Sequence, residues 1–177
     1  MITLEDLLLS RDRRTQRQRS LLGRYPGSCL LCLTVIPPGM EKRTPVSLEI
    51  AAAGVQAVRE SFNIIYEDLR DLETGYEGYF TVAGEPFELK RSAVLLEESH
   101  PLGRLWDLDV IVPSGAAVRP LSRDEIGLGE RPCLLCGKPV RLCMRLRSHT
   151  PEELISRMEE MVSDYERNKD GILGQAY

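Results

Sequence analysis

LWDLDVIV, residues 105–112, is the stretch that decides the fold, because apolar and acidic residues alternate at its start. Strict alternation is typical of a strand with one face on a hydrophobic core, since successive side chains point to opposite sides. Trp106 and Leu108 then share one face, and Asp107 and Asp109 share the other. The pattern predicts a strand that carries two carboxylates side by side.

Apolar spacing and breaker residues place the other elements around this strand. We expect helices at 3–22, 45–61 and from 150 onward, and strands at 29–36, 63–67 and 79–83. Residues 87–98 fit either a helix begun by Pro86 or a strand, and the helix is favoured. Glycines at 75 and 78 suggest a turn before the strand at 79–83. These elements predict an α/β (α+β) fold with a mixed sheet, flanking helices and a C-terminal cysteine-containing helical extension.

Length and composition are those of an ordinary globular protein. The chain has 177 residues, of which 42% are hydrophobic and 28% are charged, so we expect one domain, 1–177. Within it we expect a core at 1–118, followed by a cysteine-containing loop and C-terminal helix at 119–177. No apolar run approaches the ~20 residues that cross a bilayer, and the acidic N-terminal stretch does not resemble a signal peptide. We therefore expect a cytoplasmic protein that does not enter a membrane.

Charge is distributed unevenly around a net value of -4. Residues 10–24 contain six arginines and one aspartate, and residues 119–147 contain seven basic and three acidic residues. A nucleic-acid-binding domain is usually basic overall. An acidic protein with two local basic segments suits a phosphorylated small molecule better, although either segment alone could be a solvated surface.

The aspartate pair has the chemistry of a magnesium site. Two carboxylates on one strand face can hold Mg²⁺ together, and such a metal supports displacement at phosphorus. A D-x-D pattern by itself also occurs on ordinary polar strand faces. Just before it, Gly103 allows a tight turn, and Arg104 can pair with phosphate oxygens. This context favours phosphate chemistry at Asp107 and Asp109.

The first predicted helix carries a second set of candidate phosphate ligands. Arg11, Arg14 and Gln18 lie at positions i, i+3 and i+7, which places them on one helix face. Such a face can bind a polyphosphate. The alternative is a solvated helix surface, because arginine is a good helix former.

Four residues near the C-terminus have the chemistry of a zinc site. Cys133, Cys136, Cys143 and His149 could supply four ligands to a tetrahedral ion, and simple burial of the cysteines is the alternative. Cys29 and Cys32 form another CxxC pair. At positions i and i+3 of a strand they face opposite sides, so we expect them to be core residues.

Three stretches together resemble the apo-citrate lyase phosphoribosyl-dephospho-CoA transferase family, also called holo-citrate lyase synthases. They are LLLSRDRRTQRQ at 7–18, ESHPLGRLWDLDV at 98–110 and RPCLLCGKPVRLCMRLRSH at 131–149. The resemblance extends over nearly the whole chain, from about residue 7 to residue 161. The family pattern includes Ser10, Arg11, Asp12, Arg14, Gln18, Glu97, His100, Gly103, Arg104, Asp107, Asp109 and the four residues of the predicted zinc site.

This resemblance implies an enzyme with a nucleotidyltransferase-like fold. The reaction would transfer 2'-(5''-phosphoribosyl)-3'-dephospho-CoA from its triphosphate donor to a serine of the apo acyl carrier (gamma) subunit of citrate lyase, with release of diphosphate. It implies that Asp107 and Asp109 hold Mg²⁺, that Glu97 is the candidate third carboxylate and that His100 is the candidate base. Donor contacts would come from the family-pattern residues Arg11, Arg14, Gln18, Gly103 and Arg104.

Two other function classes are compatible with parts of the sequence. One is a non-enzymatic zinc-containing module whose basic helix binds an acidic protein or RNA. The other is a dithiol redox protein built on CxxC, which needs a thiol of lowered pKa at a helix start. Neither explains the paired aspartates of the predicted strand.

Overall fold

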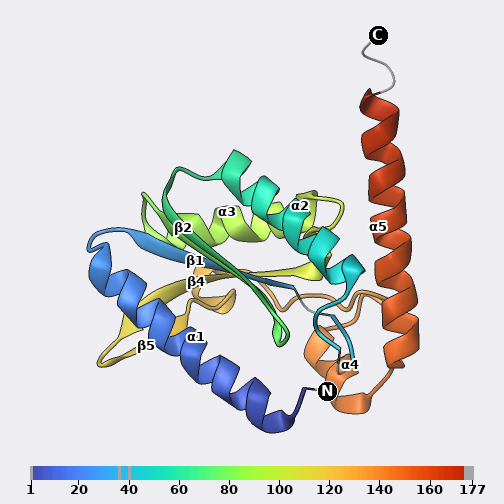
Figure 1. Ribbon diagram of the computed structural model, residues 1–177, viewed down its shortest axis with the longest axis horizontal. Coiled ribbons are helices and arrows are strands. Elements are labelled where there is room, and N and C mark those ends of the chain that lie inside the picture. Colours follow the sequence, from blue (N-terminus) through green and yellow to red (C-terminus); the bar gives the residue numbers. More distant parts are fainter. Residues whose placement is uncertain (1, 36, 40, 174–177) are drawn as a thin grey trace.

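A five-stranded antiparallel sheet with helices on both faces forms the body of the protein (Figure 1). The computed structural model describes residues 2–35, 37–39 and 41–173, with side chains to residue 169. The strands are β1 (Cys29–Val35), β2 (Ile64–Leu72), β3 (Gly75–Val82), β4 (Trp106–Ser114) and β5 (Ala117–Pro120). The helices are α1 (Leu4–Arg24), α2 (Pro45–Ser61), α3 (Pro86–Ser99), α4 (Val140–Leu146) and α5 (Pro151–Leu173).

The predicted α+β class is confirmed, but the sheet is antiparallel in all four strand pairings and not mixed. Its order is β2-β3-β1-β4-β5. The crossover through α3 joins β3 to β4, which run in the same direction but are not neighbours. β1 lies between them and is antiparallel to both. Parallel neighbours are avoided because the first strand of the chain occupies the centre of the sheet.

Two hydrophobic cores lie on the two faces of the sheet. The larger core packs α2 and α3 against Trp106, Leu108 and other residues of the sheet. The smaller core lies under α1 and includes Leu21 and Cys32. Cys29 belongs to the larger core, so the two cysteines of β1 face opposite sides as predicted. A central strand buried on both faces explains the continuous apolar run of the sequence.

Several element boundaries differ from those predicted. The helix at 86–99 is confirmed, but β3 begins at Gly75 and contains Gly78. A side chain at Gly78 would lie 2.9 Å from the ring of Phe80, so this glycine makes room for a core aromatic. The loop after β4 contains β5, and the boundary expected after residue 118 falls inside this strand. Residues 131–149, the cysteine segment, contain α4. Both elements are too short to show periodicity in the sequence.

Trp106 fixes which face of β4 points into the larger core. Its side chain is fully buried, and its indole Nε1 donates a hydrogen bond to the carbonyl of Ile50 in α2 at 2.8 Å. Gly54 of α2 allows this approach, because a Cβ there would lie 3.0 Å from the indole ring. With Trp106 pointing towards α2, the next residue, Asp107, points to the face that α1 covers.

A short 3-10 turn, Gly103–Leu105, leads from α3 into β4. A Cβ atom on Gly103 would lie 2.4 Å from the backbone oxygen of Glu97 in the last turn of α3. Only glycine therefore permits α3 and the start of β4 to lie so close together. Packing alone therefore explains why glycine occupies position 103, without any contact to a ligand.

We expect Gly103→Ala to destabilise the protein by about 1–3 kcal/mol, because the backbone of α3 must move to admit the methyl group. For a chain of this size the melting temperature should fall by roughly 2–4 °C per kcal/mol. Gly129→Ala is the matched control, since nothing lies within 4 Å of a Cβ atom there. Equal melting temperatures for the two variants would contradict the packing role.

Candidate functional site

The sheet face beneath α1 carries polar residues from the three central strands. Side chains at these positions alternate with the residues of the larger core, so they all point towards α1. The strand register arranges them in two rows: Asp109–Cys32–Tyr79 and Asp107–Thr34–Glu77. The two aspartates of the predicted magnesium site therefore lie on one face, at the β4 end of two adjacent rows of side chains.

The aspartate pair is partly open to solvent and has basic neighbours. The side chains of Asp107 and Asp109 are 46% and 37% exposed. The Nζ atom of Lys90 lies 3.5 Å from Oδ1 of Asp109, and Nη1 of Arg131 lies 3.7 Å from Oδ1 of Asp107. Burial and the adjacent Asp107 raise the pKa of Asp109 to about 6, although Lys90 opposes this shift. A carboxylate whose charge is disfavoured by burial and by a second carboxylate is stabilised by a bound cation.

Two buried charged groups of α3 hold the backbone between the aspartates. Lys90 donates a hydrogen bond from Nζ to the carbonyl of Leu108 at 2.9 Å, and Oε1 of Glu97 accepts one from the Leu108 amide at 2.8 Å. β5 pairs with residues 111–114 of β4, so among the described residues this part of the strand edge has no strand partner. Because the two side chains replace that partner, they position Asp107 and Asp109.

The sheet-facing residues of α1 match the spacing seen in the sequence. Arg14 forms an ion pair from Nε to Oε1 of Glu77 at 2.9 Å. Gln18 donates from Nε2 to Sγ of Cys32 at 3.6 Å. The side chain of Arg11 is exposed and has no ion pair among the described residues. Arg14 and Gln18 thus lie over the polar rows, and Arg11 lies at their solvent side.

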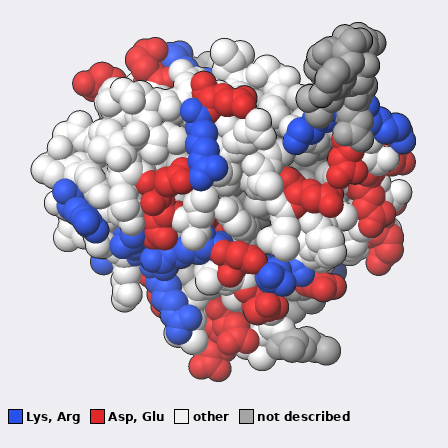
Figure 2. All heavy atoms as spheres, turned by 45° about the horizontal axis from the view of Figure 1, so that its top comes forward, with Lys and Arg blue, Asp and Glu red and all other residues white. Residues whose placement is uncertain are grey.

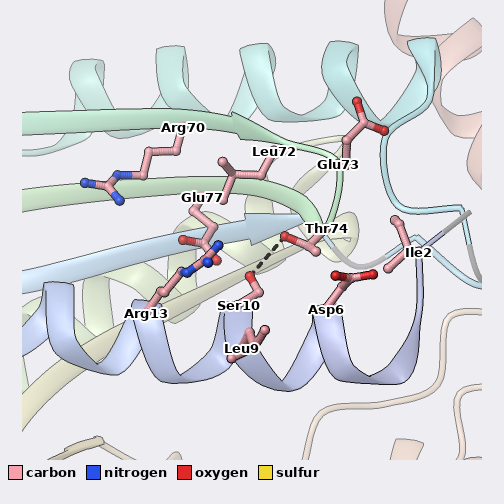
Figure 3. Close-up of a pocket in the computed structure, with 10 residues that line it drawn as sticks. All are labelled: Ile2, Asp6, Leu9, Ser10, Arg13, Arg70, Leu72, Glu73, Thr74 and Glu77. Carbon is pink, nitrogen blue, oxygen red and sulfur yellow. Dashed lines mark hydrogen bonds between the residues drawn. The ribbon is translucent and has the colours of Figure 1, made fainter.

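A cavity of about 530 Å³ opens between the first half of α1 and the turn that joins β2 to β3 (Figure 3). Ser10 of α1 points to Thr74 of this turn, and their hydroxyl groups are 3.0 Å apart. The cavity is lined by both acidic and basic side chains: Asp6, Arg13, Arg70, Glu73 and Glu77. The structure therefore places a pocket with charged side chains of both signs beside the row that contains Asp107.

Glu97 and His100 lie apart from the face that carries the aspartates. The carboxylate of Glu97 is 3% exposed, and its oxygens are occupied by the Leu108 amide and by Arg123, 2.8 Å from Oε2. The ring of His100 packs at 4.5 Å from that of Trp106 and at 5.4 Å from that of Tyr165. Its Nδ1 accepts a hydrogen bond from the Leu102 amide, and burial lowers the pKa of the imidazole. His100 thus lies on the opposite side of the sheet from Asp107.

Arg104 and Arg131 connect the start of β4 to the cysteine segment. Arg104 donates from Nη2 to the carbonyl of Pro132. Arg131 donates from Nη2 to the carbonyls of Gly103, Arg104 and Trp106. Arg131 is also the basic neighbour of Asp107. The structure therefore brings the cysteine segment next to the aspartate pair, which no spacing in the sequence reveals.

The four residues of the predicted zinc site lie together. Their ligand atoms are all within 4.8 Å of one another, and the members are Cys133, Cys136, Cys143 and His149. Sγ of Cys136 lies 3.4 Å from Sγ of Cys143 and 3.3 Å from Nε2 of His149. The backbone amide of Lys138 and then His149 lower the pKa of Cys136 to about 6. A thiol that ionises readily beside other sulfur and nitrogen ligands is suited to a metal ion.

The rest of the surface carries charges of both signs. Figure 2 shows basic and acidic side chains interspersed over the face that is seen when the α2 side is turned forward. Ion pairs such as Arg59–Glu67 and Arg43–Asp71 bring opposite charges together. Within the part of the chain that the structure describes, no helix has both the length and the apolar composition for crossing a membrane.

Sequence comparisons place these features in a known family. The family profile described as apo-citrate lyase phosphoribosyl-dephospho-CoA transferase matches residues 2–165. A protein of that name from Escherichia coli O1:K1 / APEC is 37% identical over 168 residues, which cover 92% of this chain and 90% of that protein. A protein of the same name from Shigella boydii serotype 18 (strain CDC 3083-94 / BS512) has the same identity and coverage. The chain therefore belongs to the apo-citrate lyase phosphoribosyl-dephospho-CoA transferase family.

Proposed function

We propose that the protein transfers 2'-(5''-phosphoribosyl)-3'-dephospho-CoA from its triphosphate donor to a serine of the apo acyl carrier subunit of citrate lyase. Family membership supports the reaction class. The observation that carries the assignment of the site is the pair Asp107 and Asp109, held side by side on the face that α1 covers. The serine hydroxyl attacks the phosphorus next to the ribose, and diphosphate leaves.

Basic residues around the aspartate pair counter the charge of the donor. Arg11 has no ion pair among the described residues and can contact the phosphates. Arg14 and Gln18 are held in place by Glu77 and Cys32 and line the same face. A fixed cation such as Arg14 and a fixed amide donor such as Gln18 stabilise the additional charge of a transition state at phosphorus. Gly103 and Arg104 act indirectly in this proposal, because they position the start of β4 and the cysteine segment.

The aspartate pair fits a divalent cation. Asp107 and Asp109 would hold Mg²⁺, since paired carboxylate oxygens are its preferred protein ligands and their mutual repulsion is relieved by a cation. Mg²⁺ bound there would neutralise charge on the phosphate oxygens and on the leaving diphosphate. Lys90 and Glu97 keep the two carboxylates in place through the backbone of Leu108. Glu97 is therefore a positioning residue in this proposal and not a third ligand.

We expect Asp107→Asn and Asp109→Asn to lower the rate of transfer by about 100-fold or more, because each removes a charge that acts in the transition state. The melting temperature should change little, since shape and exposure are conserved. The measurement is the mass of the apo acyl carrier after incubation with donor and Mg²⁺. Asp124→Asn, in an exposed turn, is the matched control. Near-normal transfer by either variant at saturating Mg²⁺ would remove that residue from the site.

The pKa of Asp109 predicts how the reaction depends on pH. Above a pKa of about 6 the carboxyl is mostly ionised and can bind a cation, and below it protons compete for the same oxygens. The apparent affinity for Mg²⁺ should therefore fall as the pH drops through about 6. Lys90→Met should move this midpoint to higher pH, because Lys90 lowers the pKa of Asp109. The measurement is the Mg²⁺ dependence of transfer at a series of pH values, with Lys169→Met as the control. A midpoint that moves downward in Lys90→Met would contradict the assignment.

The cluster of Cys133, Cys136, Cys143 and His149 is proposed to bind one structural Zn²⁺. Ligand distances of ~2.0–2.3 Å from a tetrahedral ion place the ligand atoms ~3.3–3.8 Å apart. The separations of 3.3 and 3.4 Å around Cys136 are compatible with that geometry. Four protein ligands complete the shell and leave no position for water, so the ion would hold α4 and the start of α5 together and take no part in transfer.

Zinc should be present at about one equivalent per chain in protein purified without chelator. We expect Cys136→Ser to remove most of this zinc and to lower the melting temperature, while transfer per folded molecule changes much less. Cys29→Ser is the control, because Cys29 lies in the core of the sheet and not in the cluster. Purified protein without zinc, or a Cys136→Ser variant that retains the metal, would refute this site.

A further inference from the structure

The segment from Arg131 to His149 differs in charge from the rest of this acidic protein. It contains five basic residues, and no acidic residue occurs between Glu130 and Glu152. Four of the bases lie on or beside α4 and are exposed: Lys138, Arg141, Arg145 and Arg147. The fifth, Arg131, is bound to the start of β4. The segment therefore gives the surface of α4 a local excess of positive charge.

Most of the exposed bases around α4 have no acidic partner in the described part of the protein. Among the described residues, Lys138, Arg145 and Arg147 form no ion pair, and the one pair of Arg141 is a contact of 3.9 Å with Glu130. By contrast, Arg14 and Arg17 of α1 are paired at 2.9 and 2.7 Å. Unpaired surface cations are free to contact an anionic partner.

Apolar side chains are exposed among these bases. Met144 is 73%, Leu146 is 64% and Leu142 is 41% exposed, and all three lie on α4. Met144 also borders a cavity of about 740 Å³ between α4 and the start of α5. Its lining includes the apolar residues Leu134, Val140 and Leu154, the basic residue Arg147 and one acidic residue, Glu152. We call α4, its four exposed bases and this cavity the α4 surface. An exposed apolar patch with a polar rim is typical of a protein-binding site.

Arg147 provides independent support for a functional surface. Among the described residues it is the only non-glycine residue with a positive φ, at 47°. It ends α4 in the left-handed conformation, where glycine is favoured because a Cβ atom crowds the backbone. An arginine at a position where glycine would fold more easily is a local backbone strain of the kind that clusters at functional sites.

We propose that the α4 surface docks the apo acyl carrier subunit through an acidic amphipathic helix of that subunit, an inference that rests on the proposed function. Apolar residues of the helix would enter the cavity, and its carboxylates would face the surrounding bases. A triphosphate would require convergent donors, whereas these bases are spread around exposed leucine and methionine side chains.

The position of the α4 surface fits this role. Arg131 at the start of the same segment lies 3.7 Å from Asp107, and Arg104 donates to the carbonyl of Pro132. The cysteine segment is thus attached directly to the strand that carries the aspartates. A carrier bound at α4 is held beside the face where the donor is expected, which limits the distance that its serine must span.

The test compares Arg147→Gly and Arg145→Ser with Arg19→Ser, which removes an exposed arginine from α1. Each α4 variant should raise the KM for the apo carrier about tenfold, because it removes a charged contact at the interface. The KM for the donor should not change. Arg147→Gly should keep or raise the melting temperature, so that weaker docking cannot be attributed to unfolding. Unchanged KM values for the carrier in both variants would overturn the proposal.

Direct titration of the apo carrier into the protein, without donor, separates this proposal from the proposed function. Saturable binding that the α4 variants weaken supports docking even if the wild-type protein shows no transfer. A raised KM for the donor in place of the carrier would assign the surface to the donor. Self-association of the wild-type protein that Met144→Ser abolishes, or RNA binding that Arg145→Ser abolishes, would each replace the carrier with another occupant and overturn the proposal.

Discussion

The site depends on two hydrogen bonds between side chains of α3 and the backbone of Leu108. Lys90 and Glu97 bind the carbonyl and the amide of this residue at 2.9 and 2.8 Å, on the edge of β4 where, in the described part of the chain, β5 does not reach. Both side chains are almost completely buried, and a buried charge is tolerated only with such partners. Since Leu108 lies between the two aspartates, the position of α3 sets the position of the carboxylates.

The two faces of the sheet have different roles: one packs against the larger core, and the other carries the residues of the proposed site. One face carries Trp106 and the larger core, and the other presents carboxylates, Tyr79 and Cys32 to α1. The second half of α1 closes the smaller core through Leu21, which is fully buried. Its first half is tied down by polar contacts, the Ser10–Thr74 hydrogen bond and the Arg14–Glu77 ion pair. Polar contacts there leave room for a charged ligand, which a fully apolar helix contact would exclude.

The cysteine segment joins the two parts of the proposed mechanism. Arg131 binds three carbonyls at the start of β4 and pairs with Asp107. The four potential metal ligands begin two residues later, and they bring the start of α5 close to α4. A metal ion there would give a short loop-rich segment the rigidity that a small core cannot supply. Rigid attachment next to Asp107 would also allow a partner bound at α4 to be oriented towards the donor.

Local spacing was enough to predict much of this protein. Alternation along 105–112 placed Asp107 and Asp109 opposite Trp106, and helical spacing placed Arg14 and Gln18 on one face of α1. The cysteine and histidine spacing identified the cluster near the C-terminus. Each of these patterns depends only on the geometry of one element or one short loop, which the order of residues determines by itself.

Contacts between distant segments were decided only by the tertiary structure. Glu77 reaches Arg14 and joins the row of Asp107 because β1 inserts between β3 and β4, a pairing that no local pattern encodes. Glu97 and His100 belong to one motif with Asp107, but the end of α3 directs them to the backbone and to Trp106. Arg131 contacts Asp107 although the two residues are far apart in the chain, and no local sequence pattern predicts such a contact. Such contacts depend on how whole elements pack, and packing is a property of the complete fold.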